Sequence, residues 1–142
     1  MNTPSHPASG IMRRRTDLPC PTMQNLSPDA LAQVAAYFSA LAEPLRLRLL
    51  NLLRGSELSV SELAEATGSS TANVSRHLAL LARQGLLARR THGTSVYYAI
   101  ADPAIYALCD LVCDNLARRF EATAAQRAAF APATRRRTLR AR

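Results

Sequence analysis

The sequence has no lysine and no long hydrophobic run, and both absences narrow the possible classes of protein. Its 18 basic residues are all arginines within a chain of 142 residues. No apolar stretch reaches the ~18–20 residues that a membrane-spanning helix needs. Arg13–Arg15 stand near the N-terminus, but no apolar segment follows them, so a signal peptide is not expected. We therefore expect a cytoplasmic protein without a membrane segment.

Cysteine is also scarce, and catalytic signatures are missing. The three cysteines, Cys20, Cys109 and Cys113, are too few and odd in number for a disulfide framework. In a reducing compartment such residues are free thiols, redox groups or metal ligands. The sequence shows no Ser–His–Asp set, paired catalytic carboxylates, P-loop or glycine-rich cofactor motif. We therefore expect neither an enzyme nor a catalytic cofactor.

The net charge of +8 is distributed unevenly along the chain. Residues 27–121 contain nine arginines and nine acidic residues, which cancel. Residues 1–26 contain three arginines and one acid, and residues 122–142 contain six arginines and no acid. Basic tails by themselves support only non-specific attraction to phosphate groups. Evidence for specific DNA binding must therefore come from the middle of the chain.

Composition divides the chain into three parts. Residues 1–26 are rich in Pro, Ser and Thr and show no periodicity, which is typical of a disordered arm. Residues 122–142 include Arg135–Arg137 and are expected to form a disordered basic tail. Residues 27–121 are predicted to fold as one domain, since the length suits a single domain with tails.

Capping signals and apolar spacing predict two helices at the start of this domain. Ser27–Asp29 combines an N-cap, a proline at the first helical position and an acid in the first turn, and predicts a helix to about residue 40. Glu43 and Pro44 restart a helix that closes near Gly55. Its buried stripe is predicted to consist of Leu45, Leu49, Leu52 and Leu53.

Two further helices are predicted around a glycine-containing turn. Ser59–Glu62 reads as a capping box, which starts a short helix over residues 60–66. After Gly68, Ser70 caps a longer helix that runs to about residue 84. Two helices joined by a tight turn form a helix-turn-helix unit.

A β-hairpin and a last helix complete the predicted domain. Residues 86–90 and 95–100 are predicted strands, and Gly93 supplies a permissive backbone in a tip over residues 91–94. Residues 102–121 are a predicted helix. The expected fold class is mainly α with a small β-hairpin, in the order α-α-α-α-β-β-α. This is a winged helix-turn-helix domain in which the hairpin is the wing.

The second helix of the helix-turn-helix unit carries the groups that DNA recognition requires. A recognition helix enters the major groove and presents donors and acceptors to base edges, where Arg76 suits guanine and Asn73 suits adenine. The helix N-terminus favours a phosphate. The predicted contacts on this segment are Ser69 and Ser70 before the helix, and Thr71, Asn73, Ser75, Arg76 and His77 on the outward side of its N-terminal half. On the wing, the predicted contacts with the DNA backbone or minor groove are Arg89, Arg90 and His92. The alternative is that these are merely solvated faces of a small helical domain.

Several stretches, taken in order, resemble the ArsR family of bacterial repressors. The matching segments are Ala40–Leu50, Leu58–Ala64, Val74–Leu81, Gly85–Leu87 and Val96–Tyr98, of which Ser-Arg-His-Leu at 75–78 is the most specific. The resemblance implies a homodimer held by the first and last helices. It also implies binding to an imperfect inverted repeat in double-stranded DNA, with release when an effector binds.

The resemblance leaves several effectors to choose from: divalent metals, trivalent arsenic or antimony, reactive sulfur or oxidants, or none. One arsenic site of the family is Cys-Val-Cys, where this chain has Ser59–Ser61, so that site is absent. Another, for zinc-like metals, uses Asp and His on the last helix. The last helix here contains no histidine, so a zinc site is not expected there.

The last helix has two cysteines instead. Cys109 and Cys113, spaced i and i+4, share one helix face with Cβ atoms ~5–6 Å apart. Trivalent arsenic and antimony prefer sulfur ligands, often three, and Cys20 is a candidate third ligand. We therefore expect release from DNA by As(III) or Sb(III), with another soft metal ion as an alternative. A redox or persulfide switch, and a regulator without an effector whose cysteines only pack, stay open.

Overall fold

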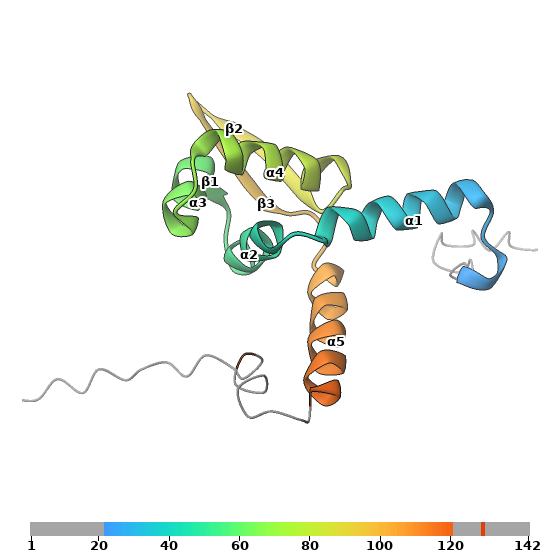
Figure 1. Cartoon of the computed structure of the whole chain (residues 1–142). Coiled ribbons are helices and arrows are strands. Elements are labelled where there is room, and N and C mark those ends of the chain that lie inside the picture. The colour runs from blue at the N-terminus through green and yellow to red at the C-terminus, as the bar shows by residue number, and fades with distance from the viewer. Residues whose placement is uncertain (1–21, 121–128, 130–142) are drawn as a thin grey trace, which may run out of the picture.

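The computed structural model describes residues 22–120 and residue 129 (Figure 1). The predictions for Cys20, for the arm up to residue 21 and for most of the basic tail therefore lie outside the described residues. The described part has a 3-10 turn at Met23–Asn25 and five α-helices: α1 Pro28–Leu41, α2 Pro44–Leu52, α3 Val60–Thr67, α4 Thr71–Arg83 and α5 Ala104–Arg119. It also has three strands: β1 Leu58–Ser59, β2 Leu87–His92 and β3 Ser95–Ile100.

The helices begin at the predicted caps. The Oγ of Ser27 accepts a hydrogen bond from the Ala30 amide at 3.2 Å, which starts α1. The capping box of α3 is complete, because the Glu62 amide donates to Ser59 Oγ at 3.1 Å and the Ser59 amide donates to Glu62 Oε2 at 2.7 Å. Such a cap stabilises a helix by about 1 kcal/mol. The helix boundaries consequently agree with the prediction to within about two residues.

The wing differs from the prediction in two respects. Strand β2 continues to His92, which pairs with Ser95, so the loop contains two residues rather than the predicted four. Gly93 takes a φ of 62° in this loop, which suits a two-residue hairpin connection. The short strand β1 was not predicted and pairs with β3, which makes a three-stranded sheet in the order β1-β3-β2. Two residues are too few to show a strand period.

The hydrophobic core lies where α2, α3 and α4 meet the sheet and the first turn of α5. Its most deeply buried side chains are Leu49, Leu63, Val74, Leu78, Leu81, Leu86 and Ile105. Full burial of one such side chain contributes about 1.5–3 kcal/mol. This core holds the helix-turn-helix unit and the wing in one body.

Helices α1 and α5 extend away from that body (Figure 1). The first two turns of α5 are tied to α2 and the residues just after it: Tyr106 donates to the carbonyl of Leu50 at 2.9 Å, and Arg54 lies 4.3 Å from the Tyr106 ring centre. Arg54 also pairs with Asp110 at 3.1 Å. Among the described residues, no helix is long and apolar enough to cross a membrane.

Candidate nucleic-acid interface and thiol cavity

The turn before α4 has a defined geometry. Gly68 ends α3 in the left-handed conformation with a φ of 69°, which a residue with a side chain rarely adopts. The Ser69 amide then donates to the Ala64 carbonyl at 3.1 Å. Arg48 of α2 donates to the carbonyls of Ala66 at 2.7 Å and Thr67 at 3.3 Å. The end of α3 is thereby held to α2.

The first turns of α4 combine polar side chains with the partial positive charge of a helix N-terminus. Thr71 and Arg76 are exposed, whereas Asn73 and Ser75 are half-buried. Arg76 donates to Asn73 Oδ1 at 3.4 Å, so the two side chains predicted to read bases lie side by side. The first turn contains no acidic residue, so its partial positive charge is available to an anion.

The two serines before α4 are placed differently from each other. Ser70 is exposed and caps the helix through its Oγ, which accepts from the Asn73 amide at 3.2 Å. Its hydroxyl proton remains able to donate to a phosphate. Ser69 is half-buried in the turn.

The outward orientation predicted for His77 is wrong. Its side chain is only 20 % exposed, and its Nδ1 lies 3.3 Å from Arg46 Nη1 and 3.8 Å from Glu43 Oε2. Arginine has no acceptor, so Nδ1 accepts from Arg46, and 3.8 Å is too long for a hydrogen bond to Glu43. His77 therefore contacts α2 instead of pointing into the solvent beside Arg76.

Glu43 completes this contact between α2 and α4. Its carboxylate caps α2 by accepting from the Arg46 amide at 3.0 Å. Partial burial raises its pKa, but hydrogen bonds from the Leu45 and Arg46 amides, with the nearby His77 and Arg46, bring the pKa below its ordinary value. The side chain is therefore a carboxylate at neutral pH, and it balances the positive charge of Arg46.

On the wing, a carboxylate engages two of the three predicted DNA contacts. Glu57, which precedes β1, accepts from Arg90 at 3.2 Å and contacts His92 Nε2 at 3.1 Å. The ring of His92 also lies 5.2 Å from the ring of Tyr97. Arg89 is exposed. Exposed ion pairs contribute only about 0–1 kcal/mol, so a phosphate can replace Glu57 on Arg90 at little cost.

The two cysteines of α5 line an apolar cavity of about 350 Å³ beside the end of α1. Cys109 is half-buried and packs against the core, while Cys113 is exposed. The other residues around this cavity are Phe38, Leu41, Ala42, Leu47, Leu108, Val112 and Leu116. We call this space the thiol cavity.

The surroundings of Cys109 favour the protonated thiol. Burial raises its pKa, Cys113 and Asp110 add to the rise through their negative charge, and Arg54 opposes it. Within the part of the chain that the structure describes, no three His, Cys, Asp or Glu side chains are grouped to hold a metal ion. One described protomer thus offers two sulfur ligands.

Sequence reasoning missed four residues around these sites. Arg46 and Glu57 contact His77 and the wing, and Phe38 and Leu41 line the thiol cavity. The signal for Arg46 was its place in the Leu-Arg-Leu-Arg stretch of α2, where arginines alternate with leucines. No local pattern connects Glu57 with residues more than 30 positions later.

Comparisons with known proteins agree with this geometry. The family described as "Bacterial regulatory protein, arsR family" matches residues 43–89. The chain is 43% identical over 91 residues to the transcriptional repressor SmtB homolog of Synechocystis sp., covering 64% of this chain and 69% of that protein.

Solved structures extend the similarity to the fold. The homodimeric winged helix-turn-helix DNA-binding domain of a possible ArsR-family regulator from Mycobacterium bovis is 39% identical, with a TM-score of 0.55 over 59% of this chain and 81% of that one. The antimony-specific transcriptional repressor AntR is 27% identical, with a TM-score of 0.57 over 79% of this chain and 97% of that one.

The match to the Synechocystis repressor covers more than two thirds of that protein, and the described residues form the same winged helix-turn-helix DNA-binding fold as the Mycobacterium domain. The relatives are transcriptional repressors and regulators, not enzymes. The chain therefore belongs to the ArsR family of bacterial transcriptional regulators.

Proposed function

We propose that this protein is a homodimeric repressor of an inverted-repeat operator, and that As(III) or Sb(III) bound by Cys109 and Cys113 releases it from DNA. The observation that carries the effector assignment is the thiol cavity, where two cysteines open into an apolar space between α1 and α5. The name of the relative AntR, an antimony-specific repressor, supports the same class of effector.

The DNA-binding part of the proposal rests on α4 and the wing. Arg76 and Asn73 are the base-reading side chains, while Ser69, Ser70, Thr71 and the helix N-terminus contact phosphate or base edges. Ser75 and His77 are proposed to contribute to DNA binding from the half-buried side of the helix. Arg89, Arg90 and His92 approach the backbone or minor groove, once Arg90 and His92 leave Glu57.

The homodimer follows from the apolar side chains that one protomer leaves uncovered. Leu31 and Phe38 of α1 are 41% and 49% exposed, and Leu111 and Val112 of α5 are 56% and 46% exposed. Large apolar side chains gathered on the surface of a protein often mark a site that a partner covers. The homodimeric Mycobacterium relative supports a second copy of this chain as that partner.

The proton balance favours a metalloid over a bare divalent cation. When antimonous acid binds, each new Sb–S bond replaces a hydroxide, which leaves as water with the thiol proton. A divalent cation instead requires thiolates and releases protons to solvent. Because the pKa of Cys109 is raised by burial, its protonated thiol suits the first reaction better.

Three sulfur ligands complete the proposed metalloid site, and Cys109 and Cys113 supply two of them. Cys20 is proposed as the third, from either protomer, and it lies outside the described residues. If Cys20 is not a ligand, one hydroxide stays on the metalloid and the site has two sulfurs.

Release then follows from a change in the relative orientation of the two protomers. Two recognition helices of a dimer must meet half-sites one helical turn apart, about 34 Å. A metalloid that draws α1 and α5 together shifts this separation. A coupling of about 1–3 kcal/mol between the two sites changes the DNA affinity by about 5–150-fold.

A gel-shift experiment on the DNA upstream of the protein's own gene tests the proposal. Antimonite and arsenite are expected to release the wild-type protein, whereas zinc and cadmium have smaller effects. The Cys109→Ser/Cys113→Ser variant is expected to bind DNA normally and to resist release, and Cys20→Ser shows whether the third ligand is needed.

Three outcomes would overturn the effector assignment. Release of the double serine variant by antimonite would show that the thiol cavity is not the site. Release by peroxide or a persulfide, without an effect of metalloids, would favour a redox switch at the same thiols. Absence of release by any of these compounds would leave a DNA-binding regulator without a thiol effector.

A further inference from the structure

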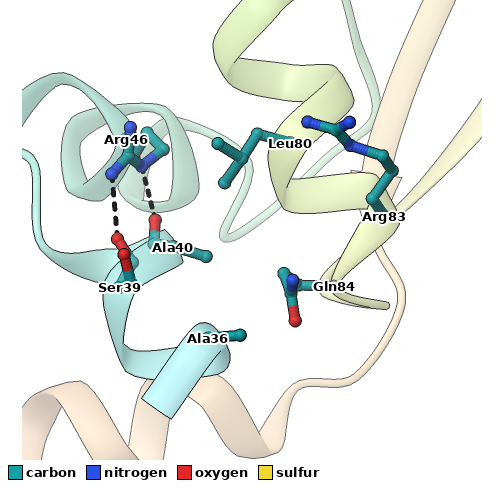
Figure 2. A pocket seen from close by; sticks show the side chains of 7 residues that line it. All are labelled: Ala36, Ser39, Ala40, Arg46, Leu80, Arg83 and Gln84. Carbon is teal, nitrogen blue, oxygen red and sulfur yellow. Dashed lines mark hydrogen bonds between the residues drawn. The ribbon is translucent and has the colours of Figure 1, made fainter. Parts of the chain in front are cut away.

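The C-terminal end of α1 belongs to two different sites at once. Phe38, Leu41 and Ala42 line the thiol cavity. The carbonyls of Ser39 and Ala40, between them in sequence, both accept hydrogen bonds from Arg46 of α2, as the dashed lines in Figure 2 show. A displacement of this turn by an occupant of the cavity therefore also moves the acceptors of Arg46.

Arg46 in turn reaches the recognition helix. Its third contact is with Nδ1 of His77 at 3.3 Å, and His77 directly follows Arg76 in α4. A second cavity of about 400 Å³, shown in Figure 2, lies beside these groups between α1 and the end of α4. The Arg46 guanidinium thus contacts both α1 and α4. The adjacent cavity leaves room for these side chains to move.

We propose that Arg46 is a positioning residue that couples the thiol cavity to the orientation of the recognition helix. The proposal rests on the function proposed above, namely that α4 reads DNA and that the cavity holds the effector. With Arg46 bound to both carbonyls and to His77, α4 keeps the orientation that fits the operator. When the end of α1 shifts, Arg46 loses this set of partners and α4 is no longer held.

The chemistry of arginine explains why this residue suits the role. The planar guanidinium presents donors in fixed directions, so it satisfies two carbonyls and one ring nitrogen at once, which a lysine ammonium on a flexible stem does not reproduce. The carbonyls at a helix C-terminus carry partial negative charge and favour a cation. Glu43, at 3.8 Å from His77, keeps the local charge balanced.

Arg48 provides a matched control on the same helix. It also donates to two carbonyls at a helix end, but these belong to Ala66 and Thr67 of α3 and not to α1. Both arginines tie α2 to a neighbouring helix. Only Arg46 contacts the turn that lines the thiol cavity.

The test measures whether DNA changes the reactivity of Cys109 and whether Arg46 is needed for that change. Full-length protein is treated with iodoacetamide, with and without a saturating DNA duplex selected in vitro by the wild-type protein. Tandem mass spectrometry of the tryptic peptide 91–118 separates alkylation of Cys109 from that of Cys113. Bound DNA holds α4 in one orientation and, through Arg46, the end of α1 over the thiol cavity, so DNA is expected to slow alkylation of Cys109 in the wild type by about five-fold or more.

The alkylation ratio is the rate of Cys109 alkylation without DNA divided by the rate with DNA. The variants Arg46→Gln and Arg46→Lys are expected to bring this ratio close to one, while Arg48→Gln keeps the wild-type value. Arg46→Lys preserves the charge and is the variant to rely on if Arg46→Gln does not fold. The proposal is overturned if Arg46→Lys retains the ratio of the wild type. It is also overturned if DNA does not change the alkylation rate of Cys109 in the wild-type protein.

Antimonite release is measured separately on the same proteins. If antimonite fails to release the wild type while the alkylation ratio behaves as expected, the effector assignment is wrong and the coupling through Arg46 stands.

Discussion

The helix-turn-helix unit and the α1–α5 pair both carry many apolar side chains but bury them to different extents. Leu78 and Leu81 of α4 are fully buried within one protomer. Leu111 and Val112 of α5 are 56% and 46% exposed. The first region contains its own core, whereas the second leaves apolar side chains exposed at the face proposed as the dimer interface.

This difference separates two tasks in one small chain. The DNA-reading surface needs a rigid support, because side chains must meet base edges at fixed positions. The sensing surface needs two arrangements of similar energy, because an effector can shift only an equilibrium that exists. Burial within the protomer supports the first task, and the exposed apolar face of α1 and α5 suits the second, as proposed above.

The largest expected effect comes from removing core volume under α4. Leu78→Ala is expected to lower the free energy of unfolding by about 2–5 kcal/mol at every protein concentration. Leu111→Ala is expected to destabilise mainly by weakening the dimer, so its effect shrinks at high protein concentration. Urea unfolding followed by circular dichroism at two concentrations measures both. If both variants lose the same free energy of unfolding at both protein concentrations, the two regions do not differ in the way described here.

The next effect is on assembly. Leu111→Asp places a charge on the exposed apolar face of α5 and is expected to weaken the dimer by about 2 kcal/mol or more, as at other buried interface positions. Asn115→Asp adds the same charge at an exposed polar position of the same helix and serves as the control. Sedimentation equilibrium gives the dissociation constants. An unchanged dimer in Leu111→Asp would place the interface elsewhere.

A third effect concerns base reading. Arg76→Ala is expected to cost about 1–3 kcal/mol at the specific operator and to relax the base preference at one position. Arg83→Ala removes an exposed arginine from the last turn of the same helix, and is expected to leave the base preference unchanged. Binding titrations with a set of single-base operator variants distinguish the two. An equal loss of affinity on every operator variant would indicate that Arg76 contacts a phosphate and not a base.

The smallest effect is a shift in a pH profile. Because burial and the neighbouring Cys113 and Asp110 raise the pKa of Cys109, its thiolate forms at higher pH than that of a free cysteine. The thiolate is the reactive form, so alkylation should rise with pH about a midpoint above that of a cysteine peptide. Cys113→Ser should lower this midpoint, and Arg54→Gln should raise it. Shifts in the opposite directions would contradict the assigned causes.

Local signals along the chain predicted most of the fold. The caps at Ser27, Ser59 and Ser70 and the apolar periods located the helices, because capping and periodicity depend on residues three to four positions apart. The same reasoning failed at β1, whose two residues become a strand only by pairing with Tyr97 and Tyr98 of β3.

The candidate sites were predicted less completely than the helices. The sequence indicated that Cys109 and Cys113 share a face, but not that α1 closes a cavity over them. It assigned the outward side of α4 to His77, because helical spacing alone does not show where a neighbouring helix packs. The contact with Arg46, 31 positions earlier, decides that orientation.

The sequence by itself determined the order of the five helices and the two wing strands, the helix-turn-helix unit with Arg76 and Asn73, and the family. These depend on short-range spacing and on motifs that a linear chain displays. Only the tertiary structure decided that Glu57 engages the wing, that Arg46 joins α1 to α4, and that the cysteines face an apolar cavity. Such contacts bring together residues that are distant in sequence, and only packing of the core sets their distances.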